Sequence, residues 1–235
     1  MGLIVFLGDS ITDAGRKESS NQLGFGYVNI FSETLKDQNQ DWTIINRGVE
    51  GYVTEHIAQT LHGECISLHP DYVSILVGIN DIGLIVGAEA SEQDKLYMLE
   101  DSIRAYHEML FDLSRETNAK VIILEPFIFP KDGKYEDWVP WQKKMSKNIK
   151  KLARNYGAFF IPLQEPMNAK IREMGFEAIT TDGNRPENAC PDCKRIFLSV
   201  THSGFFCILR NIRCFFSETF LIQKFVSFSE YKKYC

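Results

Sequence analysis

A five-residue apolar run that stops at a glycine and is followed at once by polar residues constrains this chain more than any other stretch. The run from Leu3 to Leu7 is too short for a helix and fits a strand that is buried on both faces. Gly8 permits a tight turn, so Ser10 falls where the strand ends and a helix can begin, and a helix N-terminus stabilises negative charge. This position suits a nucleophile whose attack creates an oxyanion. The alternative is that Ser10 is only a helix N-cap, with Asp13 completing a capping box.

Length and composition limit the class of protein. With 235 residues, of which 44% are hydrophobic and 24% charged, we expect a globular fold of ordinary domain size. A net charge of −5 gives no support to nucleic-acid binding, which usually needs a basic stripe. The N-terminus lacks a basic segment before its apolar run, and no segment approaches the roughly 20 apolar residues of a membrane span. We therefore expect a cytoplasmic protein.

Predicted strands and helices alternate along the chain. Strands are expected at 3–7, 42–45, 71–77, 120–124 and 158–161, and helices at 27–36, 54–67, 95–117 and 140–156, with Thr54 as an N-cap. Such alternation predicts a mainly parallel α/β sheet that is covered by helices on both faces. Ligands bind beyond the carboxyl ends of the strands in sheets of this kind.

Polar turns follow several of these predicted strands, at 8–10, 46–51, 78–81 and 125–126. Ester hydrolysis by a serine needs a nucleophile, a base and donors for the oxyanion. Ser10 is the candidate nucleophile, and its own N–H, the Gly51 N–H and the Asn80 side-chain amide are the candidate donors. The alternative for Gly51 and Asn80 is that they only shape or stabilise their turns.

Three of these segments resemble the signatures of the GDSL, or SGNH, hydrolases: Gly8-Asp9-Ser10-Ile11-Thr12-Asp13, Asn46-x-Gly48-x-x-Gly51 and Gly78-Ile79-Asn80-Asp81. The resemblance covers about residues 3–183 and implies a three-layer α/β/α, flavodoxin-like fold. It also implies that Ser10 is the nucleophile and that Ser10, Gly51 and Asn80 form the oxyanion hole. A narrower resemblance, over residues 23–28, is to intracellular carbohydrate acetylesterases of the family.

The fourth signature of that family, Asp-x-x-His, is only half present. Asp182 matches the aspartate that orients the imidazole, but Arg185 stands where the histidine is expected. A guanidinium has no acceptor and stays protonated, so it cannot act as a general base. The histidines at 56, 62, 69 and 107 are interpreted as surface or packing residues. His202 could replace the missing base only if the end of the chain folds back toward Ser10.

The last 49 residues differ in composition from the rest. Residues 1–186 carry a net charge of −8 and one cysteine, whereas residues 187–235 carry +3 and five cysteines. The spacing of Cys190 and Cys193 permits a zinc or redox pair, but Cys207 and Cys214 supply no second close pair. The interpretation we favour is a changed reading frame near Asn184, which would leave an atypical, poorly ordered tail. A genuine divergent tail is the rival.

These observations together predict a GDSL-type esterase domain over residues 1–186 that uses no metal or organic cofactor. The expected substrate is a small acyl ester such as an acetylated sugar, and Arg185 predicts crippled turnover. The alternative is an inactive member of the same fold that binds an acylated carbohydrate or a protein partner. Assembly into a homo-oligomer stays open.

Overall fold

The apolar run at the start of the chain forms the second strand of a five-stranded sheet. The computed structural model describes residues 2–38, 41–178 and 180. Strand β1 (Gly2–Gly8) pairs in parallel with β2 (Trp42–Gly48) on one side and with β3 (Tyr72–Leu76) on the other. Strands β4 (Lys120–Leu124) and β5 (Phe159–Ile161) extend the parallel sheet in the order β2-β1-β3-β4-β5. The predictions for Asp182, Arg185, His202 and residues 187–235 lie outside the described residues.

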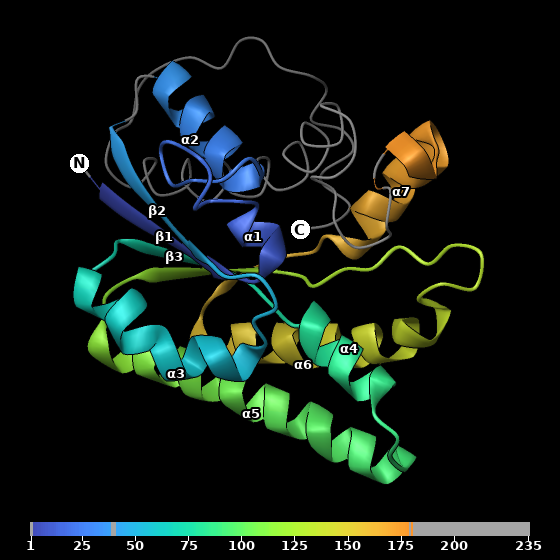
Figure 1. Cartoon of the computed structure of the whole chain (residues 1–235). Coiled ribbons are helices and arrows are strands. Elements are labelled where there is room, and N and C mark those ends of the chain that lie inside the picture. The colour runs from blue at the N-terminus through green and yellow to red at the C-terminus, as the bar shows by residue number, and fades with distance from the viewer. Residues whose placement is uncertain (1, 39–40, 179, 181–235) are drawn as a thin grey trace.

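Helices connect the strands. They are α1 (Ser10–Asp13), α2 (Tyr27–Asp37), α3 (Thr54–Glu64), α4 (Ile79–Gly87), α5 (Glu92–Glu116), α6 (Val139–Tyr156) and α7 (Gln164–Met174), with short 3-10 turns at Ile66–Leu68, Glu136–Trp138 and Phe176–Ala178. The predicted parallel α/β sheet with helices on both faces is confirmed. Helices α1, α2 and α7 lie on one side of the sheet, and α3, α4, α5 and α6 cover the other (Figure 1).

Burial on both faces explains why the strands are almost continuously apolar. All five residues of β3 are buried, as are Ile4 to Leu7 of β1. On the α2 side, the Phe6 ring contacts Tyr27 and Phe31 edge-on, with centroids 5.8 and 5.5 Å apart. No helix in the described part of the chain is long and apolar enough to cross a membrane.

Three local predictions are corrected by the structure. The turn expected over 46–51 is wrong for its first three residues, because β2 continues to Gly48 opposite Gly8. Thr54 is not an N-cap, since Val53 occupies that position and Thr54 is the first residue of α3. Residues 79–81 are not a terminal turn but begin α4. Neither α4 nor α7 was predicted from the sequence.

Candidate active site

Ser10 is the first residue of α1, directly beyond the carboxyl end of β1. The preceding residue, Asp9, is the N-cap, and its carboxylate accepts a hydrogen bond from the Ile11 N–H at 2.9 Å. The interpretation of Ser10 as a capping residue is therefore wrong. Ser10 is half-buried, and neither its hydroxyl nor its N–H has a hydrogen-bond partner among the described residues. Both groups are thus available to a ligand.

Glycine at position 8 lets α1 begin close to the sheet. A Cβ on Gly8 would clash with the Thr12 hydroxyl and with the Leu76 carbonyl oxygen on the neighbouring strand. The chain can therefore turn sharply from β1 into α1, and Ser10 remains at the edge of the sheet. Because β1 connects toward β2 on one side while the rest of the sheet grows on the other, this edge is the topological switch point at which ligands bind in such folds.

The turn after β2 carries the second candidate donor. Residues Val49 to Tyr52 form a turn that is closed by a 3.2 Å hydrogen bond from the Tyr52 N–H to the Val49 carbonyl oxygen. Gly51 is its third residue and has a φ of 78°, which is the value that a type II turn requires there. Gly51 is exposed, and its N–H donates no hydrogen bond to any residue in the described ranges.

Asn80 lies in the first turn of α4, beyond the end of β3. Its side-chain amide donates a hydrogen bond to the Tyr52 carbonyl oxygen at 2.9 Å. The amide therefore reaches toward the turn that carries Gly51. Ser10, Gly51 and Asn80 thus follow three adjacent strands at one edge of the sheet, and a direct contact joins the segments of Gly51 and Asn80.

Asn46 connects the end of β2 to α1, a role that was not predicted from the sequence. Its side-chain nitrogen donates to the carbonyl oxygens of Thr12 at 2.7 Å and Leu23 at 2.9 Å. Its side-chain oxygen accepts a hydrogen bond from the Gly48 N–H at 2.9 Å. A single buried amide therefore fixes the end of β2 against α1 and the loop that follows it.

Charged side chains lie beside α1. Arg16 donates to the Gly48 carbonyl oxygen at 2.6 Å, and the same nitrogen is 3.3 Å from an Asp13 carboxylate oxygen. Burial raises the pKa of Asp13 above its ordinary value, although Arg16 opposes the shift. Asp13 therefore pairs with Arg16 and does not complete a capping box with Ser10.

The four histidines in the described part of the chain are exposed, as predicted: His56, His62, His69 and His107. His107 pairs with the Tyr156 hydroxyl at 2.8 Å, far along α5 from the candidate residues. His56 lies in the first turn of α3 and packs against the Tyr52 ring, with the ring centroids 5.1 Å apart. Within the described residues, none of these four histidines forms a hydrogen bond or an ion pair with Ser10.

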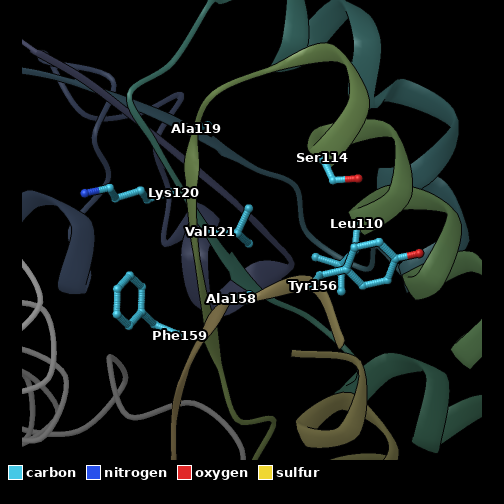
Figure 2. Close-up of a pocket in the computed structure, with 9 residues that line it drawn as sticks. Leu110, Ser114, Ala119, Lys120, Val121, Tyr156, Ala158 and Phe159 are labelled. Carbon is cyan, nitrogen blue, oxygen red and sulfur yellow. The ribbon is translucent and has the colours of Figure 1, made fainter. Parts of the chain in front are cut away.

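Figure 2 shows the residues that line a separate pocket of about 230 Å³. This pocket lies at the amino ends of strands β4 and β5. Its walls include Lys120 and Phe159, the first residues of β4 and β5, together with Leu110 and Tyr156 from α5 and α6. Since the candidate residues follow the carboxyl ends of strands, this pocket is not part of their site.

The parallel sheet with helices on both faces and Ser10 at its switch point place the protein in the α/β class, and comparisons with known proteins identify its family. The chain belongs to the GDSL-like lipase/acylhydrolase family, whose model matches residues 6–185. It is 27% identical over 199 residues to an acetylxylan esterase of Geobacillus stearothermophilus, across 79% of this chain and 87% of that protein. The family and this relative place the chain among carboxylic-ester hydrolases.

Solved structures of related proteins share the fold. A protein from Parabacteroides merdae assigned as a GDSL-like lipase superposes with a TM-score of 0.72 and 25% identity, over 86% of this chain and 95% of that one. The acetylxylan esterase of Geobacillus stearothermophilus superposes with a TM-score of 0.74 and 20% identity, over 86% of this chain and 93% of that one. The resemblance to the GDSL hydrolases and the expected fold class are both confirmed.

Proposed function

We propose that the chain cleaves small acyl esters through an acyl-enzyme on Ser10. In this proposal the Ser10 N–H, the Gly51 N–H and the Asn80 side-chain amide bind the oxyanion that forms on the ester carbonyl. The observation that carries the proposal is the position of Ser10 at the switch point, with its hydroxyl and N–H unpaired among the described residues. The direct contact between the Asn80 amide and the turn of Gly51 supports a shared site.

The reaction has two steps. The Ser10 hydroxyl oxygen attacks the ester carbonyl and loses its proton, the tetrahedral oxyanion collapses, and the alcohol leaves with a proton. Water then attacks the acyl-serine, so that the carboxylic acid is released and the serine hydroxyl is restored. Three donors around the oxyanion would stabilise both tetrahedral intermediates, and removal of one such donor typically costs a factor of about 100 to 1,000.

The proposed enzyme has no histidine at the position where the family signature places the acceptor of the Ser10 proton. Asp182 matches the aspartate of the Asp-x-x-His signature, but the histidine position holds Arg185, whose guanidinium cannot take the Ser10 proton. Loss of the base from a serine triad lowers turnover by a factor on the order of 10⁶ in subtilisin. We therefore propose that the unmodified chain is a very poor esterase, with turnover far below a typical value of about 10 s⁻¹.

The proposed substrate is an acetyl ester on a sugar. The support is the similarity to the Geobacillus stearothermophilus acetylxylan esterase. Two catalytic mutants of that enzyme have been solved, one with a serine replaced by alanine and one with an aspartate replaced by alanine. Ser10 and Asp182 are residues of these two types.

A second function is favoured by Arg185 itself. A chain that has lost its base but keeps the oxyanion donors would bind an acylated carbohydrate, or a protein partner, without turning it over. In that case saturable binding of an acetylated xylo-oligosaccharide would be measurable while hydrolysis would not.

Hydrolysis of p-nitrophenyl acetate, compared between the unmodified chain and Ser10→Ala, tests the proposed enzyme. We expect a slow rate that disappears in Ser10→Ala and rises in Arg185→His. A rate that is unchanged in Ser10→Ala would contradict Ser10 as the nucleophile. Turnover near 10 s⁻¹ in the unmodified chain would contradict the crippled site, and His202→Ala and His56→Ala would then identify the base.

A further inference from the structure

We propose that Asp81 is a positioning residue for this reaction, because its buried carboxylate ties the turn that carries Gly51 to the helix that carries Asn80. The inference rests on the proposed function and deepens it, since it names what holds the oxyanion donors in place. Asp81 itself touches no reacting atom in this scheme. It acts through the backbone of the segment from Gly51 to Thr54.

Both the backbone N–H and the hydroxyl of Thr54 donate hydrogen bonds to the Asp81 carboxylate. The Thr54 N–H lies 3.2 and 3.1 Å from the two carboxylate oxygens of Asp81, and the Thr54 hydroxyl donates to one of them at 3.1 Å. Both side chains are almost completely buried, with Asp81 4% exposed and Thr54 0% exposed. Two groups that are 27 residues apart in sequence are thus joined in a site that solvent does not reach.

The segment after Gly51 is attached to α4 at two points. The Tyr52 carbonyl oxygen accepts from the Asn80 amide, and two residues later Thr54 donates to Asp81. Asn80 and Asp81 are neighbours in the first turn of α4, so both attachments meet the same helix end. Gly51 precedes this doubly held segment by one residue. Movement of its N–H relative to the Asn80 amide is therefore restricted by both attachments.

Burying a charged carboxylate at this place costs free energy of folding. Burial raises the pKa of Asp81, and hydrogen bonds from Thr54 and the Ser102 side chain only partly oppose the shift. The first turn of a helix stabilises negative charge, which offsets part of the cost. A neutral acceptor such as an amide offers only one oxygen to Thr54, whereas the Asp81 carboxylate places two oxygens against the Thr54 N–H and hydroxyl.

A positioning role and a merely structural role predict different couplings. If Asp81 acts through the oxyanion donors, its replacement should matter much less once Asn80 has been removed, because residues that act as a unit are strongly non-additive. If Asp81 only stabilises the fold, its replacement should lower the reactive fraction by the same factor in both backgrounds. A double-mutant cycle between Asp81→Asn and Asn80→Ala therefore separates the two roles.

The measurement is the second-order rate constant for labelling of Ser10 by a fluorophosphonate probe, with the labelled residue identified by mass spectrometry. Rates are normalised to the folded fraction given by circular dichroism. We expect Asp81→Asn to slow labelling by about 100-fold, the cost of a misplacement of about 1 Å at a reacting centre. In the Asn80→Ala background the same change should slow labelling by less than about threefold. Thr54→Val removes one of the hydrogen bonds and should slow labelling by several-fold.

The matched control is Glu55→Gln, which removes a neighbouring charge from the first turn of α3. Glu55 is exposed and contacts Gln59 rather than Asp81, so labelling should be unchanged. Labelling of Asp81→Asn at the normal rate, or slowing by equal factors in both backgrounds, overturns the inference alone. If Ser10 is labelled neither in the unmodified chain nor in Arg185→His, the proposed function fails and the inference falls with it. Where Asp81→Asn does not fold, the same cycle with Thr54→Val decides.

Discussion

The side-chain amide of Asn80 donates a hydrogen bond to the Tyr52 carbonyl oxygen at 2.9 Å and so joins the start of α4 to the turn after β2. A carbonyl oxygen can only accept, so the nitrogen of the Asn80 amide must face Tyr52. The amide has two protons, and this contact uses one. The orientation of the second donor is therefore fixed before any substrate binds, which is the arrangement that lowers the reorganisation cost of binding an oxyanion.

Replacement of Asn80 by alanine is expected to lower kcat by about 100 to 1,000-fold, because one prearranged oxyanion donor is lost. KM for p-nitrophenyl acetate should change little, since the donor acts on the charge that develops after binding. The measurement is steady-state hydrolysis in the Arg185→His background, where turnover is expected to be easier to detect.

Asn155→Ala is the control for this change. Asn155 is exposed near the end of α6, at the amino end of β5 and so away from Ser10. Its replacement should leave both kcat and KM unchanged. A fall in kcat for Asn155→Ala, or no fall for Asn80→Ala, would contradict the assignment of Asn80 as a donor.

Two glycines offer a matched test of backbone strain. A Cβ would meet nothing within 4 Å at either Gly51 or Gly63, but only Gly51 has a positive φ, of 78°. Gly51→Ala should therefore lower the free energy of unfolding by about 1–2 kcal/mol, the cost of a left-handed conformation with a side chain. Gly63→Ala, within α3, should raise it by roughly 0.5–1 kcal/mol. Urea unfolding of both variants measures the difference, and equal effects would contradict the strain argument.

Local patterns in the sequence were sufficient to predict the sheet and the position of Ser10. The short apolar runs between polar turns identify every strand, and the strand over 120–124 has the observed limits. Helix α4 was not predicted, because its N-cap is Gly78, which offers no capping side chain. Two glycines also interrupt the apolar pattern of this helix. Two adjacent cap-forming residues, Asp9 and Ser10, could not be told apart by sequence alone.

Contacts between distant segments could not be predicted at all. The attachment of Thr54 to Asp81 and the bonds from Asn46 to the loop after α1 join residues that are more than 20 positions apart. Such pairs depend on how the strands order themselves in the sheet, which local propensity does not determine. They are also the contacts that place the candidate donors, so the motif identifies the residues but the fold sets their geometry.

The thiol of Cys65 should be unreactive in the folded protein. Cys65 is fully buried after the end of α3, and burial raises its pKa from 9.0 to about 12, with Arg47 opposing the shift. At pH 8, iodoacetamide should leave Cys65 unmodified in the native protein and modify it quickly in urea, as read by peptide mass spectrometry. Modification at equal rates in both conditions would contradict the burial of this thiol.

The same shift has a consequence for stability. Because the pKa of Cys65 is higher in the folded state, the protonated thiol contributes stability that is fully present below about pH 9. This contribution is lost as the pH rises from about 9 to about 12. The free energy of unfolding should therefore fall over this range, and the slope should be shallower in Cys65→Ala.

Glu125 is expected to stabilise the fold rather than to take part in chemistry, although it follows β4 at the same edge of the sheet as Ser10. One of its carboxylate oxygens accepts hydrogen bonds from the N–H groups of Leu163 at 2.8 Å and Gln164 at 2.9 Å, where α7 begins. A helix N-terminus exposes unpaired N–H groups and favours negative charge, so the carboxylate acts there as a remote cap. Glu125→Ala should lower the free energy of unfolding by about 1–2 kcal/mol, the cost of losing a cap.

Glu125→Gln separates the contribution of charge from that of the hydrogen bonds, because the amide keeps one acceptor oxygen while losing the charge. Its effect should be about half that of Glu125→Ala, and neither variant should change the rate of Ser10 labelling beyond the loss of folded protein. Glu173→Ala, at the exposed pair with Lys170 near the end of α7, is the control and should cost less than about 0.5 kcal/mol. If Glu125→Gln abolished labelling while the protein remained folded, Glu125 would belong to the reaction and its role as a cap would be secondary.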